Sequence, residues 1–150
     1  MLEDFRHLTH YRIPFADLDC MQHVNHLAHL RWAETTRTEY FVEVLGERVN
    51  GERGFILVNL HFTYERQLDF RERVVIGTRV SRIGRRSFDF LYEIVSQEGE
   101  RPAAHGVTTM VAYDYPQRAS IVVPAEWRKK IARFEIIPPT ENSEVPPRAL

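Results

Sequence analysis

Several polar side chains that can take part in chemistry are concentrated near the start of the chain. Two carboxylates, a thiol, two imidazoles and an amide fall within ten residues, directly before a segment with helical spacing of apolar residues. A loop that leads into a helix can present ionisable groups beside backbone N–H donors that have no partner within the helix. This combination suits a reaction at a carbonyl carbon. The six residues are Asp17, Asp19, Cys20, His23, Asn25 and His26.

Attack on a carbonyl needs a nucleophile or a base, together with donors aimed at the oxygen where negative charge develops. The carboxylate of Asp17 or Asp19 can meet the first need. The first backbone N–H groups after Asn25 can meet the second, helped by the positive end of the helix dipole. Asp19 precedes Asn25 by six residues, so one tight loop can place both around a single carbonyl. The alternative is structural, because aspartate often caps turns through its own local backbone.

Other side chains in the same region offer competing chemistries. The spacing of His23, His26 and His29 suggests a metal site, because residues three apart on a helix share one face approximately. Cys20 could act as a nucleophile with His23 as its base, although a single cysteine is usually a small apolar residue.

Composition narrows the possible partners of the chain. It has 150 residues, a formal net charge of −1, one cysteine and 43% hydrophobic residues. The charge argues against general nucleic-acid binding, and the single cysteine excludes an internal disulfide framework. We find no apolar run long enough to cross a membrane and no signal-peptide pattern, and therefore expect a cytoplasmic protein.

The chain as a whole predicts an α+β fold. Residues 1–136 form one expected domain, and the tail at 137–150, which contains four prolines, is expected to be irregular. Period-two alternation predicts half-buried antiparallel strands, with sets such as Ile56-Val58-Leu60 and Val107-Val111-Tyr113 aligned on one face. The predicted strands are 8–15, 55–64, 73–82, 87–96 and 103–115, and the predicted helices are 25–45 and 124–133. Asn25 and Gly46 suit the two ends of the first helix. Glu34 and Arg37, three residues apart on its inner stripe, are expected to pair.

Three segments resemble the hotdog-fold acyl-CoA thioesterases of the 4-hydroxybenzoyl-CoA thioesterase type. The similarity covers roughly residues 8–134 and implies an antiparallel sheet of about five strands wrapped around one long central helix. The segments are Arg12-Ile13-Pro14-Phe15-Ala16-Asp17-Leu18-Asp19, His23-Val24-Asn25-His26 and Leu30-Arg31-Trp32-Ala33-Glu34-Thr35-Thr36-Arg37.

The resemblance implies roles for single residues. Asp19 corresponds to the catalytic carboxylate, as nucleophile or general base, and Asp17 to a residue that shapes the loop. Backbone donors at Asn25 and His26 would hold the oxyanion, and His23 would support catalysis. Basic residues of one hairpin would bind the nucleotide end of coenzyme A, namely Arg82, Arg85 and Arg86.

The resemblance also implies an assembly and an activity. The protein is expected to be a homodimer or homotetramer with sheets joined edge to edge and the site at the interface, and to need no metal or redox cofactor. The expected activity is hydrolysis of an acyl-CoA thioester. Alternatives are an acyl-carrier-protein thioesterase, a non-catalytic acyl-thioester-binding protein, a hotdog dehydratase and a catalytic role for Glu34. Met21, Gln22 and His26 depart from the residues usual in these families.

Overall fold

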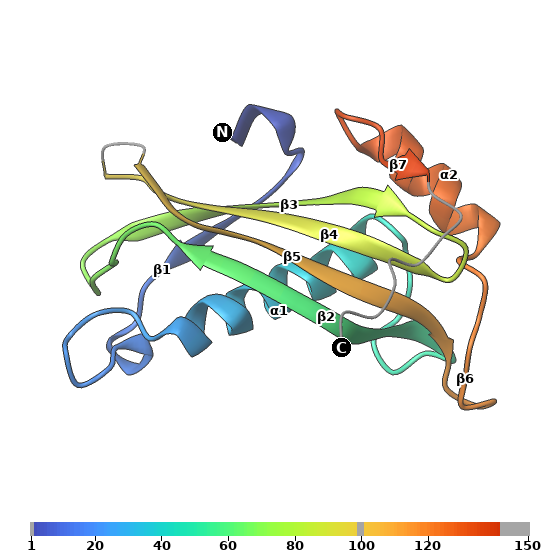
Figure 1. Ribbon diagram of the computed structural model, residues 1–150, viewed down its shortest axis with the longest axis horizontal. Helices are drawn as coiled ribbons and strands as arrows, with labels where there is room; N and C mark the ends of the chain where they lie inside the picture. Colours follow the sequence, from blue (N-terminus) through green and yellow to red (C-terminus); the bar gives the residue numbers. More distant parts are fainter. Residues whose placement is uncertain (1, 99–100, 142–150) are drawn as a thin grey trace.

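The computed structural model describes residues 2–98 and 101–141, which form one mainly antiparallel sheet and two α-helices (Figure 1). The long strands lie in the order β1-β3-β4-β5-β2, so β1 and β2 are the edges. Two short strands extend this sheet, β6 beside β5 and β7 beside β3. The bounds are β1 His7–Arg12, β2 Arg53–Tyr64, β3 Arg73–Ile83, β4 Ser87–Ser96, β5 Arg101–Asp114, β6 Ala119–Ser120, β7 Thr140–Glu141, α1 His26–Glu43 and α2 Ala125–Phe134, with 3₁₀ turns at Leu2–Asp4 and Phe15–Asp17.

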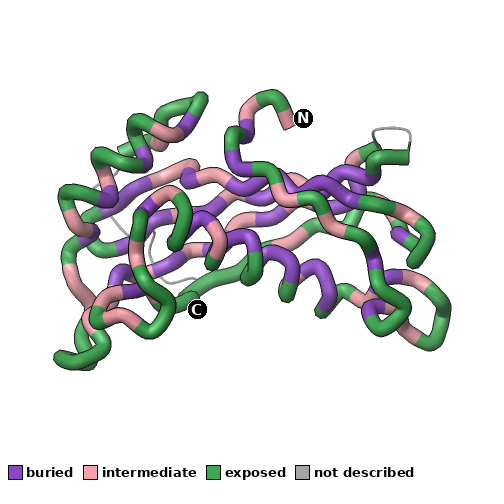
Figure 2. The backbone as a smooth tube through the Cα atoms, turned by 180° about the vertical axis from the view of Figure 1, so that it is seen from behind, coloured by how far each residue is buried: buried purple, intermediate pink, exposed green. Residues whose placement is uncertain are grey.

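The sheet curls around α1, which lies along one of its faces (Figures 1 and 2). The side chains between them form two buried clusters. One, near the start of α1, includes Trp32, Leu68 and Ile76; the other, near its end, includes Tyr40, Phe90 and the Trp127 side chain of α2. The predicted hotdog arrangement of a curved sheet around a central helix is confirmed.

The ends of α1 follow the local sequence signals. Asn25 caps the helix, and its side-chain oxygen accepts a hydrogen bond from the Leu27 N–H at 3.0 Å. Gly46 adopts φ of +68°, the left-handed conformation that commonly follows a helix and that glycine tolerates best. The helix itself ends at Glu43, two residues before the predicted end.

The alternation of apolar and polar residues predicted the buried faces of β3 and β4 correctly, but it predicted the buried face of β5 incorrectly. In β5 the predicted set around Val107 and Val111 is only partly buried, and the face turned to the core carries Ala104, Gly106 and Met110 instead. A Cβ atom added at Gly106 would lie 2.5 Å from the ring of Phe62. Small residues on this face therefore make room for aromatic rings from neighbouring strands.

The apolar face predicted for β2 is exposed in the single chain. Ile56, Val58 and Leu60 are 39%, 58% and 39% exposed, and a register shift between Leu57 and Asn59 interrupts the pairing with β5. The expectation of half-burial was wrong for this strand because it forms an edge of the sheet. An edge strand with exposed apolar side chains is a surface suited to pairing with another chain.

The C-terminal segment is more regular than predicted. After α2, the two residues Thr140 and Glu141 pair in parallel with Arg82 and Ile83 of β3, whereas irregular structure was expected from residue 137. The remaining part of the predicted tail, 142–150, lies outside the described residues. No helix in the described part of the chain is long and apolar enough to span a membrane.

Candidate active site

The polar cluster lies on a small hairpin between β1 and α1. Leu18 and Val24 form an isolated antiparallel bridge, and the N–H of Asp19 donates to the His23 carbonyl at 2.8 Å. Gln22 stands at the turn with φ of +63°, a conformation in which glycine is least strained. Gln22 thus forms the turn in a conformation that side chains other than glycine seldom adopt. The hairpin pairs Asp19 with His23, three residues before α1 begins at His26.

Asp17 is buried and held by two side chains of α1. One carboxylate oxygen forms an ion pair with Arg31, and the other accepts a hydrogen bond from the indole N–H of Trp32 at 3.0 Å. Its backbone carbonyl accepts the Asn25 N–H at 2.8 Å. With both carboxylate oxygens engaged, Asp17 fixes the loop against the helix, as the resemblance implied.

Asp19 is arranged differently although it is only two residues away. Its Oδ1 accepts backbone N–H groups from Met21 at 2.8 Å and from His23 at 3.3 Å. Among the described residues, none donates a hydrogen bond to Oδ2. The side chain is partly exposed. Backbone amides therefore orient this carboxylate while one oxygen stays available to a substrate or a water molecule.

The helix start offers one donor rather than the two predicted. The Asn25 N–H is already bound to the carbonyl of Asp17, and the Leu27 N–H is bound to the Asn25 side chain. The Ala28 N–H donates to the Asn25 carbonyl. The His26 N–H has no acceptor in the described part of the chain. The Asn25 N–H is therefore not available to a ligand, because the Asp17 carbonyl already accepts it, and the His26 N–H is the one that has no acceptor among the described residues.

The remaining residues of the cluster are less involved. The backbone of His23 binds Asp19 in both directions, while its imidazole forms no hydrogen bond with the residues described. Cys20 is exposed and is not hydrogen-bonded to His23. No three histidine, cysteine or acidic side chains within residues 2–98 and 101–141 are placed to hold a metal ion.

His29 shows why the histidine spacing does not make a metal face. Its ring is buried between Trp32 and Tyr64, with ring centroids 5.0 and 5.1 Å away. Burial lowers the pKa of His29, and its Nδ1 lies 3.3 Å from the Asn25 carbonyl oxygen. His26, by contrast, is exposed to solvent, so the three imidazoles do not converge.

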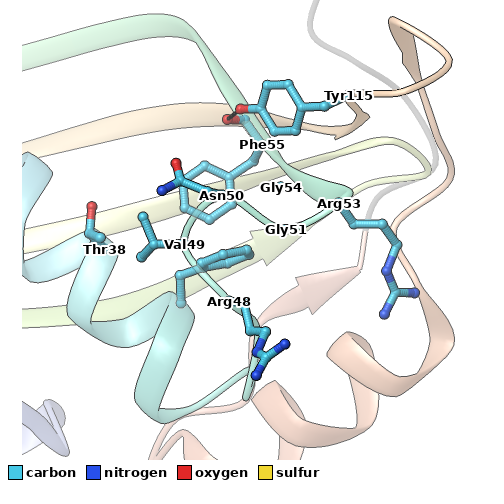
Figure 3. A pocket seen from close by; sticks show the side chains of 10 residues that line it. Thr38, Arg48, Val49, Asn50, Gly51, Arg53, Gly54, Phe55 and Tyr115 are labelled. Atoms are coloured by element: carbon cyan, nitrogen blue, oxygen red, sulfur yellow. Dashed lines mark hydrogen bonds between the residues drawn. The ribbon is translucent and has the colours of Figure 1, made fainter.

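A cavity of about 630 Å³ runs from the helix start along the gap between α1 and β2. A second cavity of about 490 Å³ continues it toward Tyr115, and the two share Thr38 and Phe55 (Figure 3). The first cavity is mostly apolar, with three charged side chains on its helix wall. Its lining residues are Leu27, Leu30, Arg31, Glu34, Arg37, Thr38, Phe55, Leu57, Leu60 and Met110.

The three arginines predicted to bind coenzyme A have different surroundings. Arg82 is bound by Asp89 through two hydrogen bonds of 2.6 and 2.8 Å, and Arg86 donates to the carbonyl and hydroxyl of Ser120. The side chain of Arg85 is exposed and forms no hydrogen bond or ion pair with the described residues. Of the three, Arg85 has the guanidinium most available to a phosphate.

The arginine hairpin also lies far from Asp19 within one chain. The end of β1, just before the Asp17 loop, pairs with Arg73 at the start of β3. The hairpin follows the far end of this 11-residue strand, which at the usual rise corresponds to about 35 Å. Figure 1 shows the loop before α1 and the β3–β4 turn at opposite ends of the molecule. The two parts of the predicted site are therefore not brought together by a single chain.

The sequence pattern of the thioesterase-like superfamily matches residues 13–134, which include the whole hairpin, α1 and the long strands β2 to β5. The chain belongs to this superfamily. As a member of the superfamily, the protein is a thioester hydrolase. No curated protein sequence is significantly similar to it.

Solved structures of similar fold come from several bacteria. The PA5185 protein from Pseudomonas aeruginosa strain PAO1 is 25% identical with a TM-score of 0.80, covering 89% of this chain and 94% of its own. A thioesterase from Thermus thermophilus, complexed with coenzyme A and Zn, is 24% identical with a TM-score of 0.79 over 91% and 98%. A 1,4-dihydroxy-2-naphthoyl-CoA thioesterase from Synechocystis is 17% identical with a TM-score of 0.74 over 83% and 93%. The last two likenesses concern the fold alone.

Sequence reasoning missed the residues that hold the site in place. Arg31 and Trp32 lie inside the segment that carries the family resemblance, and their spacing from Asp17 across a helix start could have suggested the contact. The carbonyl of Leu68, which accepts the Val24 N–H at 2.8 Å, follows β2 and is distant in sequence. No local pattern indicates it.

Proposed function

We propose that the protein hydrolyses an acyl-CoA thioester, as a hotdog enzyme of the 4-hydroxybenzoyl-CoA thioesterase type. The observation that carries the proposal is the contrast between the two aspartates of the loop. Asp17 has both oxygens engaged by α1, whereas Asp19 is oriented by amides and keeps Oδ2 open. Structures of similar fold include one complexed with coenzyme A and one named as a CoA thioesterase.

In the proposed reaction, the thioester carbonyl lies between Asp19 and the start of α1. The Asp19 carboxylate attacks the carbonyl carbon or takes a proton from an attacking water molecule. The His26 N–H and the positive end of the helix dipole stabilise the oxyanion. Collapse of this intermediate releases the coenzyme A thiolate. The general-base route leaves the free acid directly, whereas direct attack leaves an anhydride between the acyl group and Asp19, which water then hydrolyses to the free acid and the regenerated carboxylate. The chemistry requires no cofactor, and the acyl group extends into the apolar cavity between α1 and β2.

The first test replaces Asp19 by asparagine, which keeps an oxygen for the amides of Met21 and His23 but removes the reactive carboxylate. We expect turnover of a panel of acyl-CoAs to fall by a factor of about 100 to 10,000, measured with a thiol-detecting reagent. Asp114→Asn is the matched control, because Asp114 caps a turn through the Gln117 N–H at the opposite end of the sheet.

Each outcome of this test separates the proposals. Full turnover by Asp19→Asn would show that the assigned mechanism is wrong. Tight binding of acyl-CoA by the wild type without thiol release would identify a non-catalytic binding protein. If the protein hydrolyses acyl-carrier-protein thioesters faster than acyl-CoAs, its substrate is carried by acyl carrier protein and not by coenzyme A.

We further propose that two copies complete the coenzyme A site. A two-fold pairing of the exposed β2 edges runs the two strands antiparallel. The β3–β4 hairpin of one copy then lies at the same end as the Asp19 loop of the other. This arrangement removes the separation of about 35 Å found in one chain and covers an apolar edge. The exposed Arg85 would reach the nucleotide phosphates of the substrate bound by its neighbour.

Arg85→Ala tests this assignment. We expect KM for an acyl-CoA to rise about tenfold, while KM for the same acyl group on pantetheine, which lacks the nucleotide, stays unchanged. Arg118→Ala is the control, because Arg118 is an exposed arginine on a different turn. Equal changes with both substrates would contradict a phosphate contact.

A further inference from the structure

Arg37 is a buried cation that forms no ion pair with any residue the structure describes. Only 6% of the residue is exposed, and its one hydrogen bond among the described residues goes from Nη1 to the Tyr92 hydroxyl at 3.2 Å. Its Nε is buried without a partner. The ion pairs found among the described residues do not include Arg37. Burying a charge is costly unless it is paired, so an anion from elsewhere is expected.

Glu34, on the same α1 wall of the cavity, is an anion that has no paired cation among the described residues. It is exposed, it lines the same 630 Å³ cavity as Arg37, and its carboxylate binds no residue in the described part of the chain. The two side chains are one helical turn apart, yet they form no ion pair within one chain, contrary to the expectation from their spacing. An unpaired anion and an unpaired cation therefore border one groove.

Both residues also lie at the middle of the surface that a second copy would cover. At the end of β2, the ring centroids of Tyr64 and His29 are 5.1 Å apart. Near the start of β2, the ring centroids of Phe55 and Phe41 are 5.0 Å apart. Halfway between the helix positions 29 and 41 is residue 35. A two-fold axis through the centre of the β2 edge therefore passes level with the part of α1 between Glu34 and Arg37.

We propose that Glu34 of one copy enters the groove of the other and pairs with its Arg37, and that the reverse contact forms across the axis. In a two-fold interface every contact occurs twice, so a residue on one side of the axis meets the residue on the other side. The β2 edge supplies the apolar area, and the two ion pairs fix the register of the edges. The partner on this surface is thus a second copy of the chain, and it contributes a charged residue to the wall of each cavity.

This inference rests on the proposed pairing of β2 edges, but it makes a narrower claim. The dimer dissociation constant is measured by sedimentation of a fluorescently labelled chain over a dilution series. Glu34→Lys places a cation against each buried Arg37 and is expected to raise this constant by a factor of about 100 or more. Glu34→Gln, which removes the charge without reversing it, is expected to have a smaller effect.

Glu43→Lys is the matched control, because it makes the same charge change on the same helix. Glu43 lies beside His7 of β1, toward the other edge of the sheet, and its substitution is expected to leave the dissociation constant unchanged. The charge-swapped chain, Glu34→Lys with Arg37→Glu, is expected to recover at least a tenth of the lost affinity. If that chain does not fold, the salt dependence of dimerisation decides, and it should be weaker in Glu34→Gln than in the wild type.

A Glu34→Lys dimer as tight as the wild-type dimer would overturn the ion pairs while leaving edge pairing intact. A wild-type chain that is monomeric at every concentration would overturn both the ion pairs and the shared coenzyme A site. Hydrolysis of acyl-CoA by the wild type, measured in parallel, reports on the proposed reaction separately from either result.

Discussion

Near each end of α1 a buried carboxylate ties the helix to the rest of the chain, and the two are held by different donors. Before the helix, Asp17 receives a guanidinium and an indole N–H, one on each oxygen. Near its end, Glu135 receives the Tyr40 hydroxyl at 2.5 Å and the Val80 N–H at 2.8 Å, both on Oε1. The Oε2 of Glu135 is buried and has no hydrogen-bond partner in the described part of the chain.

The difference follows from what each end does. Beside Asp17 lie the partly exposed Asp19 and the His26 N–H, which has no acceptor among the described residues, and the proposed reaction needs this loop to hold one conformation. A carboxylate with a cationic partner and both oxygens satisfied gives that rigidity. At the other end Glu135 joins Tyr40 of α1 to Val80 of β3 inside the aromatic cluster, where nothing has to bind. There, burial raises the pKa of the Glu135 carboxyl, against hydrogen bonds that lower it.

The largest expected effect comes from changing the first carboxylate. Asp17→Asn puts an amide N–H against the donors of Arg31 or Trp32 and leaves a buried N–H unsatisfied. We expect the free energy of unfolding to fall by about 2 kcal/mol, measured by urea denaturation, together with a loss of turnover because the Asp19 loop loosens. In Asp19→Asn the amide acceptor remains, and stability should change by less than about 0.5 kcal/mol.

This pair of variants tests the roles assigned to the two aspartates directly. If Asp19→Asn is the less stable of the two, then the exposed aspartate is the structural one and the roles are reversed. If Asp17→Asn keeps full stability but loses turnover, Asp17 acts in the reaction rather than on the loop.

The sequence predicted the architecture better than the contacts. Alternation in β3 and β4, the cap at Asn25 and the stop at Gly46 are local signals, and the structure follows them. The buried face of β5 was wrong because Gly106 and its neighbours look like poor core residues until the ring of Phe62 is placed against them. The exposure of β2 was missed because alternation does not distinguish an edge strand whose apolar residues face solvent from a covered one.

For the candidate site too, the sequence indicated a location but not the contacts within it. The order of polar residues from Asp17 to His26 was enough to select the loop, but not to show that the Asn25 N–H is consumed by Asp17. Arg82 and Asp89 are directly opposite each other only because the register of β3 and β4 shifts between Val80 and Arg82, which no spacing rule anticipates. The distance between the arginine hairpin and Asp19, in contrast, could have been estimated from the length of the intervening strand.

The smaller expected effect concerns the second carboxylate and depends on pH. Because burial raises the pKa of Glu135 above its ordinary value of 4.5, the folded chain binds this proton more tightly than the unfolded chain. The stability that the group contributes is therefore fully present below about pH 4.5 and is lost as the pH rises through the raised pKa. Glu135→Gln removes the titration, so the difference in unfolding free energy, wild type minus variant, should fall with rising pH over that window.

The unfolding free energies are measured by urea denaturation at each pH. Glu126→Gln is the control, because its effect on the unfolding free energy should change with pH in the opposite direction. The hydrogen bond from Arg53 lowers the pKa of Glu126, so the contribution of that group is lost as the pH falls and not as it rises. Its exposed position makes this difference small. A wild-type minus Glu135→Gln difference that stays flat with pH would mean that Glu135 has an ordinary pKa in the folded chain. The hydrogen bonds from Tyr40 and Val80 would then fully offset the cost of burying the charged form of Glu135.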